Sequence, residues 1–175
     1  KLAINYTFAP NKDIEKSLIE RKIDIGLLTE ISKDKNIISQ KVALEPLVLV
    51  TSSDVRTLNW EELMQLGFIN HPDGEHHAYA LLSKNYPEFE HISQFEHKGF
   101  SNQISLILEP VSLGFGFTVL PLHAAKAFHQ PNKIRVQPLK YSVNETLYLC
   151  QNRHSFVSNR RDYIKSTIVN FMYNN

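Results

Sequence analysis

The stretch Ser101-Asn-Gln-Ile-Ser-Leu-Ile-Leu-Glu-Pro-Val-Ser-Leu-Gly-Phe-Gly-Phe-Thr-Val-Leu-Pro121 decides how the rest of this sequence is interpreted. Its first half carries apolar residues at helical spacing, namely Ile104, Ile107, Leu108, Val111 and Phe115. The run from Phe117 to Leu120 is apolar and β-branched over the length of a strand, and a proline ends it. We therefore expect a helix capped by Ser101 or Asn102, a Gly-Phe-Gly corner and a buried strand. The free N–H groups and positive dipole end of such a helix suit a small anion or polar ligand.

Outward from this stretch, predicted strands and helices alternate along the chain. The expected strands are residues 2–6, 23–29, 42–51, 68–70, 93–98, 133–137 and 145–151. The first expected helix is capped by Asn11 or Asp13 and carries Ile14, Leu18 and Ile19, and the second is capped by Asn59 and ended by Gly67. Two further helices are expected over 75–85 and 122–128. The C-terminal helix is expected to be capped by Ser158 or Asn159 and to bury Ile164, Ile168, Phe171 and Met172. The first strand, helix and second strand form a βαβ unit with parallel strands, and residues 30–41 form a polar loop. Pro110 predicts a kink or an early end of its helix. The alternation indicates an α/β fold.

Composition excludes several classes of protein. The 175 residues allow one domain or two small lobes, and 19 Lys and Arg nearly balance 18 Asp and Glu, so no basic field exists to bind a phosphate backbone. The single cysteine, Cys150, lies in an apolar run and is expected to be a buried thiol, which favours a reducing, cytoplasmic compartment. No apolar run is long enough for a membrane span, and the first residues do not form a signal peptide. Because the chain opens inside a predicted strand without Met, we expect further sequence before Lys1.

Four segments, taken in order, resemble the effector-binding domain of LysR-type transcriptional regulators. They are residues 18–29 (Leu-Ile-Glu-Arg-Lys-Ile-Asp-Ile-Gly-Leu-Leu-Thr), 45–50 (Glu-Pro-Leu-Val-Leu-Val), 68–74 (Phe-Ile-Asn-His-Pro-Asp-Gly) and the opening stretch through Pro121. Each is mostly a hydrophobic pattern, and their joint order and spacing carry the resemblance. It implies two Rossmann-like lobes joined by two crossover strands, as in type 2 periplasmic binding proteins, with the inducer bound between the lobes.

The resemblance also implies a division of the chain. Residues 1–48 and 151–175 would form regulatory lobe I, with its first strand and helix missing, and residues 49–150 would form regulatory lobe II. The best candidates for the crossovers are residues 45–52 and 145–153. In that family a winged helix-turn-helix precedes the domain, so this chain would contact DNA only through a domain that it lacks.

Polar residues at strand ends line the cleft in this family, as the general rule for open α/β sheets expects. Thr29 resembles the family's pocket threonine or serine, although a plain strand-ending hydroxyl is the alternative. Asn70 and His71 follow a strand and could donate to a carboxylate, and for His71 a simple turn role is equally favoured. Ser101 and Asn102 match the position where a second helix N-terminus meets the ligand, although capping alone would explain both.

Two further residues are candidate ligand contacts, and the sequence argues against a metal site, a dinucleotide site and a catalytic site. Phe117 and Thr118 follow the glycine corner, where the family often contacts the ligand, and core packing is the stronger role for Phe117. The eight histidines include His71, His76 and His77, but they lack a metal-ligand spacing, so we expect no metal and no cofactor. The Gly-Phe-Gly corner follows a helix and is therefore not a dinucleotide loop. No catalytic motif is present, so we expect no enzyme.

The sequence thus predicts a ligand-sensing regulatory domain of a bacterial LysR-type regulator. Its polar groups mildly favour a small carboxylate or other anion as inducer. The full-length protein would be a cytoplasmic homodimer or homotetramer with no membrane partner. The alternatives are a periplasmic-type solute-binding protein of a transporter and a small α/β enzyme.

Overall fold

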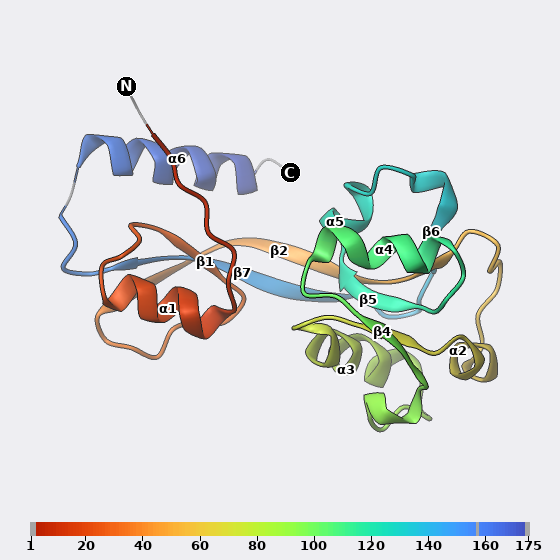
Figure 1. Ribbon diagram of the computed structural model, residues 1–175. Helices are drawn as coiled ribbons and strands as arrows, with labels where there is room; N and C mark the ends of the chain where they lie inside the picture. Colours follow the sequence, from red (N-terminus) through yellow and green to blue (C-terminus); the bar gives the residue numbers. More distant parts are fainter. Residues whose placement is uncertain (1–2, 157, 174–175) are drawn as a thin grey trace. The chain divides into compact units, whose positions relative to one another are not determined.

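A computed structural model describes residues 3–156 and 158–173, and these residues form two compact units (Figure 1). Unit 1 comprises both ends of the chain, up to Leu44 and from Glu145 onward, and unit 2 is the continuous segment Glu45–Asn144. Two strands, β2 (Ile37–Ser52) and β7 (Val143–Asn152), run from one unit into the other. Strands rather than a flexible linker therefore make both connections.

Unit 1 is built around the helix α1 (Asn11–Ile19) and the short strand β1 (Gly26–Leu28). The strand β1 pairs antiparallel with β7, and Leu27 lies opposite Leu149. One cluster of buried side chains in this unit consists of Leu18, Leu28, Ile37 and Cys150. Burial raises the pKa of the Cys150 thiol above its usual value, while a hydrogen bond with Ser39 opposes that shift. The prediction of a buried thiol is confirmed.

The predicted βαβ unit at the start of the chain is wrong. Residues 3–10 have no regular structure, and β1 has an antiparallel neighbour instead of a parallel one. A strand forms where its backbone groups find partners, and within the described part of the chain no strand pairs with residues 3–6. The predicted polar loop is also too long, since β2 already begins at Ile37, whose side chain is buried in the unit 1 cluster.

The last helix of unit 1, α6 (Asn159–Tyr173), begins as predicted. The Arg161 N–H donates to the Ser158 hydroxyl at 3.2 Å, so Ser158 is confirmed as its cap. The predicted buried stripe is wrong: no residue of α6 whose burial is described is buried, and Phe171 is 65% exposed. Apolar spacing alone predicts the helix, but burial also needs a facing surface.

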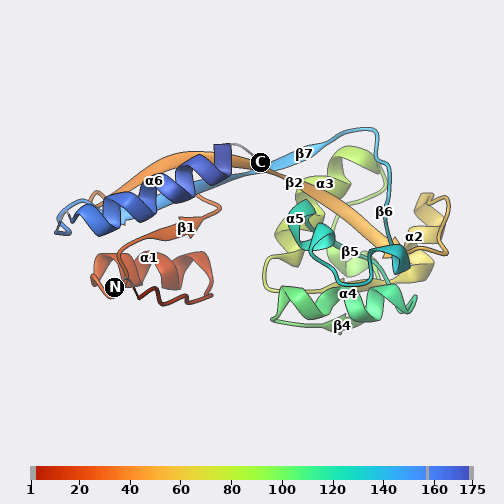
Figure 2. The ribbon, with the colours of Figure 1, turned by 90° about the horizontal axis from the view of Figure 1, so that it is seen from above.

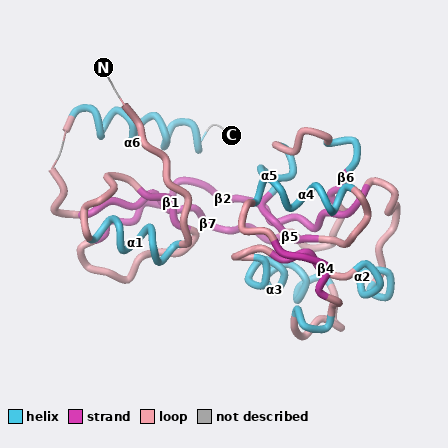
Figure 3. Tube along the Cα trace, in the orientation of Figure 1, coloured by secondary structure: helices cyan, strands magenta, loops and turns pink. Residues whose placement is uncertain are grey.

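Unit 2 contains the remaining strands and four helices (Figures 1 and 3). The strands β3 (Phe68–Asn70) and β4 (His97–Phe100) are parallel, and Phe117 forms a parallel bridge with Phe68. The strands β5 (Thr118–Pro121) and β6 (Ile134–Val136) pair antiparallel with β2. The helices are α2 (Trp60–Leu66), α3 (Gly74–Asn85), α4 (Ile104–Ser112) and α5 (Leu122–Lys126), with 3-10 turns at Ile92–Gln94 and Pro131–Lys133.

Helices cover both faces of the strands of unit 2, as Figures 1 and 2 show for α3 and α4. Alternate residues of each strand enter different clusters, because successive side chains of a strand point to opposite faces. Phe68 and Phe117 join the cluster under α2 and α3, whereas Ile69 and Leu120 join the cluster under α4 and α5. Unit 2 is therefore a three-layer α/β arrangement.

Local signals predict several elements of unit 2 correctly. Asn59 caps α2 through a capping box with Glu62, and Gly67 ends the helix with a φ of 71°. The predicted strand over 93–98 is shifted, since a 3-10 turn occupies Ile92–Gln94 and β4 begins at His97. Pro110 does not end its helix early, because α4 continues to Ser112.

The glycine corner joins α4 to β5 and uses its two glycines differently. Gly114 has a φ of 80°, which favours glycine. A Cβ on Gly116 would lie 2.8 Å from the carbonyl oxygen of Gly67, which accepts a hydrogen bond from the Phe117 N–H. The apolar pattern of the opening stretch extends too far at this corner, since Phe115 is 59% exposed; Ile104 at the other end is exposed as well.

Gly116→Ala is expected to lower the free energy of unfolding by about 1–3 kcal/mol, because the clash is with backbone that cannot move aside. The matched control is Gly99→Ala, since a Cβ at Gly99 meets nothing within 4 Å. The control should change stability by less than about 0.5 kcal/mol. Urea unfolding followed by the fluorescence of the single tryptophan, Trp60 in unit 2, measures both. Equal stability of the two variants would contradict the close approach at Gly116.

Candidate functional site

The candidate residue of unit 1, Thr29, directly follows the carboxyl end of β1 and is partly exposed. Asn11, the first residue of α1, binds it twice: the Asn11 side-chain Nδ2 donates to Thr29 Oγ1 at 2.8 Å, and the Thr29 N–H donates to Asn11 Oδ1 at 3.3 Å. Neither Asn11 nor Asp13 caps the helix, because Pro10 occupies the N-cap position without a side-chain cap bond. The amide of Asn11 is directed to the strand end instead.

A second contact fixes the loop that follows Thr29. The Ser32 hydroxyl donates to the Glu15 carboxylate, and the Ser32 N–H donates to the Ser39 hydroxyl at 3.3 Å. Asn11 and Glu15 are four residues apart and therefore share one face of α1. Two side chains from a single helix face thus bind the segment 29–32.

The candidate residues of unit 2 meet at the carboxyl ends of two neighbouring parallel strands. Asn70 ends β3, and Ser101 directly follows β4. The Ser101 N–H donates to the Asn70 carbonyl oxygen at 3.1 Å, and the His71 N–H donates to Asn70 Oδ1 at 2.8 Å. Ligands of open α/β sheets bind outside the carboxyl ends of the strands. The structure therefore brings Asn70, His71 and Ser101 together at the edge where such a ligand would bind.

The capping prediction for α4 is wrong by one to two residues. The helix begins at Ile104, and its N-cap residue is Gln103, which makes no side-chain cap bond. The Ser101 hydroxyl instead accepts from the Gln103 N–H and donates to the Gln103 carbonyl oxygen, both at 3.1 Å. Asn102 is exposed between them. Such local side-chain to backbone bonds compete with true capping.

His71 and Thr118 are buried and bind backbone oxygens. The ring Nε2 of His71 lies 2.8 Å from the Val119 carbonyl oxygen, and because a carbonyl can only accept, this Nε2 carries the proton. The Thr118 hydroxyl donates to the Ile69 carbonyl oxygen at 2.9 Å. Thr118 thereby connects β5 to β3, and His71 connects β5 to the residue that follows β3. Their polar atoms hold the sheet together at the candidate site.

Phe117 is fully buried and lies back from the carboxyl edge of the sheet. Its ring packs edge-on against Phe68 at 5.2 Å and Phe95 at 4.9 Å between ring centroids. Since Phe117 pairs with Phe68, the first residue of β3, it lies at the opposite end of that strand from Asn70. The contacts of Phe117 are those of a core residue.

Other features of the molecule lie away from these residues. Among the described residues, no group of three His, Cys, Asp or Glu side chains could hold a metal ion, and no described helix is long and apolar enough to cross a membrane. The rings of His71 and His77 are 5.2 Å apart between centroids.

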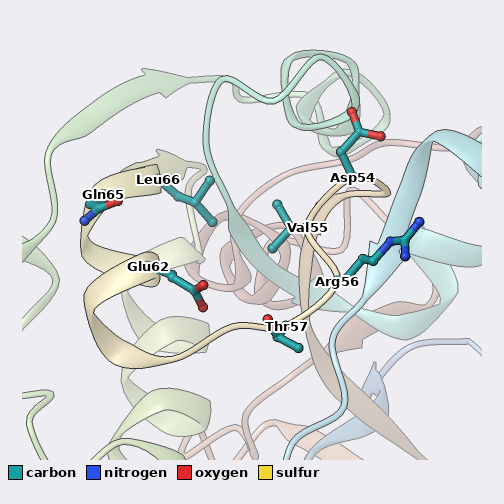
Figure 4. A pocket seen from close by; sticks show the side chains of 7 residues that line it. All are labelled: Asp54, Val55, Arg56, Thr57, Glu62, Gln65 and Leu66. Carbon is teal, nitrogen blue, oxygen red and sulfur yellow. The ribbon is translucent and has the colours of Figure 1, made fainter.

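An open hollow of about 360 Å³ in unit 2 (Figure 4) contains no candidate residue; its lining residues are Asp54, Val55, Arg56, Thr57, Glu62, Gln65 and Leu66. Glu62 is already bound in the capping box of α2.

The chain matches the family model of the LysR substrate binding domain over residues 1–161, and it therefore belongs to this family. This membership identifies a regulatory domain of transcription regulators rather than an enzyme, and it favours the regulator over the solute-binding protein of a transporter. Comparison with curated proteins gives no match.

Solved structures similar to this chain include effector-binding domains of the same family. The effector-binding domain of QuiR in complex with shikimate has a TM-score of 0.68 at 13% identity, covering 95% of this chain and 80% of that chain. The CcmR regulatory domain of Synechocystis PCC6803 in complex with 2-PG has a TM-score of 0.71 at 13% identity, covering 94% and 81%. A variant of the OxyR regulatory domain from Pseudomonas aeruginosa has a TM-score of 0.66 at 17% identity, covering 96% and 80%.

These likenesses show the fold. The α/β, type 2 periplasmic-binding-protein-like fold that the sequence predicts is confirmed.

Sequence reasoning missed one residue at the candidate site, Asn11, which it treated only as a helix cap. No local signal distinguishes this role from capping, because an asparagine at a helix start is also a preferred N-cap.

Proposed function

We propose that this domain binds one small polar effector, a carboxylate or another anion. The observation that carries the proposal is the position of the polar groups. Thr29 in unit 1 and Ser101 in unit 2 each directly follow a strand, and Asn70 ends the strand beside Ser101, in a chain that belongs to the LysR substrate-binding family. Backbone N–H groups, hydroxyls and amides are donors that suit an acceptor-rich ligand.

Within this proposal, unit 1 corresponds to regulatory lobe I and unit 2 to regulatory lobe II, and each unit contributes polar contacts to effector binding. Thr29, Asn70, Ser101 and Asn102 are the direct contacts. His71, Phe117 and Thr118 hold the strands beneath them, since their polar atoms and rings contact the sheet itself.

The proposal extends to the full-length regulator, a homodimer or homotetramer in the cytoplasm that contacts DNA through a winged helix-turn-helix. Effector binding would favour one arrangement of the lobes over another. A coupling free energy of about 1–3 kcal/mol is enough to change how such an oligomer holds DNA.

Thr29→Val is expected to weaken effector binding about tenfold, because the loss of one hydrogen bond to a charged group costs about 1.5 kcal/mol or more. Ser101→Ala should weaken it less, since the Ser101 hydroxyl already binds Gln103. Native mass spectrometry of the purified chain identifies any retained ligand, and calorimetry with that ligand, with shikimate and with 2-PG measures affinity.

The matched controls are Thr7→Val and Ser105→Ala, which change exposed residues of the same types. Circular dichroism should show that all four variants remain folded. Binding that is unchanged in both Thr29→Val and Ser101→Ala would refute the proposed contacts.

A further inference from the structure

The side-chain amide of Asn11 has only one possible orientation. The Thr29 backbone N–H is a donor and cannot accept, so the Asn11 atom that faces it at 3.3 Å must be the oxygen. The NH₂ group of Asn11 is then the atom that lies 2.8 Å from Thr29 Oγ1. The backbone of the strand end therefore fixes which amide atom reaches the threonine hydroxyl.

This orientation determines the role of the hydroxyl. An NH₂ group can only donate, so Thr29 Oγ1 accepts the Asn11 hydrogen bond. Within residues 3–156 and 158–173, no acceptor receives the Thr29 hydroxyl proton. Because Thr29 is partly exposed, that proton is available to a ligand at the end of β1.

We propose that Asn11 sets the polarity of the effector contact at Thr29, so that the threonine hydroxyl acts as a hydrogen-bond donor and selects effectors that present an acceptor, such as a carboxylate, over those that present only donors, such as an ammonium group. Asn11 is thus a positioning residue and not itself a contact. The inference rests on the proposed function, in which Thr29 contacts the effector.

Asn11→Asp tests the polarity without removing the bridge. One carboxylate oxygen can still accept from the Thr29 N–H, and the other accepts the Thr29 hydroxyl proton. The hydroxyl then presents its lone pairs to the ligand, which reverses its role. An acidic residue in the first turn of a helix is favourable, so this variant is expected to fold.

The probes are acetate, which only accepts, and ethylammonium, which only donates. Titration of each, followed by the Thr29 amide signal in ¹H–¹⁵N NMR spectra, measures millimolar affinities. In the wild-type chain, acetate should bind and ethylammonium should not. Asn11→Asp should weaken acetate at least tenfold and allow ethylammonium to bind.

Lys12→Gln is the matched control for charge, because it lowers the net charge by the same one unit at the next, exposed position of α1 and leaves the bridge intact. Its acetate affinity should stay within threefold of wild type. Asn11→Ala is the second variant: it frees the hydroxyl to rotate, and it should weaken acetate several-fold and raise the rate of hydrogen exchange at the Thr29 amide.

The outcomes separate the inference from the proposed function. If Thr29→Val loses acetate binding while Asn11→Asp and Asn11→Ala match Lys12→Gln, Thr29 remains a contact and the role of Asn11 is overturned. If Thr29→Val binds acetate as the wild type does, the contact itself is overturned. Lack of any acetate response in the wild-type chain would overturn both.

Discussion

Phe117→Ala is expected to lower the free energy of unfolding of unit 2 by about 3–5 kcal/mol. The ring is fully buried in the cluster under α2 and α3, and it packs edge-on against Phe68 and Phe95. Such aromatic pairs contribute about 0.5–1.5 kcal/mol beyond the area they bury. The surroundings cannot collapse to fill the cavity, because the Phe117 backbone is bound on both sides, by its N–H to Gly67 and by its carbonyl oxygen to Ile69.

Phe115→Ala is the matched control for this prediction. The two phenylalanines flank Gly116 in the same corner, but Phe115 is mostly exposed. Its replacement should change stability by less than about 0.5 kcal/mol. Trp60 reports unfolding of this unit, since its ring lies 5.4 Å from that of Phe95. Similar midpoints of urea unfolding for the two variants would contradict the assignment of Phe117 to the core.

Leu18→Ala is expected to destabilise unit 1 by about 2–5 kcal/mol. Leu18 is the one buried residue of α1, and it packs so close to β1 that a Cβ added to Gly26 would lie 3.1 Å from its Cδ1. The backbone at this point is held independently of the side chain, because Asn152 Nδ2 donates to the carbonyl oxygens of Leu18 and Ile19 at 3.1 and 3.3 Å. The loss should therefore reflect the leucine side chain itself.

Cys150 provides the measurement for this second prediction. It is the single cysteine of the chain and belongs to the same buried cluster as Leu18. Its rate of reaction with a thiol reagent reports how often unit 1 opens, because a buried thiol with a raised pKa reacts slowly. Leu18→Ala should raise this rate by at least tenfold, whereas Ile19→Ala, at a more exposed position, should raise it less than about fivefold. Equal rates in the two variants would show that α1 does not pack through Leu18.

Elements marked by local chemistry could be predicted from the sequence. Asn59 with Glu62 and Gly67 defines both ends of α2, and Ser158 defines the start of α6, because these signals act within a few residues. Burial and strand pairing could not be predicted in the same way. They depend on a partner distant in the sequence, which is why residues 3–6 and the apolar side of α6 were assigned incorrectly.

The candidate site shows the same division. The strand end at Asn70 follows from an apolar run that stops at a polar residue, whereas the end of β4 before Ser101 does not, since β4 is polar and mostly exposed. The parallel pairing of β3 and β4 then brings Asn70 and Ser101 together. The Asn11–Thr29 bridge joins residues on different elements, and a single asparagine at a helix start predicts a cap equally well. The partner of the Asn11 side chain is determined by the packing of α1 on β1, which local sequence does not reveal.

The division of the chain between the two units has a consequence for the order in which the protein folds. Unit 2 is one continuous segment, so its strands β3 to β6 are synthesised before most of β7. The pairing of β1 with β7 must wait until the chain beyond unit 2 has been synthesised. During that interval Leu18 and Leu28 lack their partner Cys150. The surroundings of Thr29 at the end of β1 are therefore complete only after β7 has been synthesised.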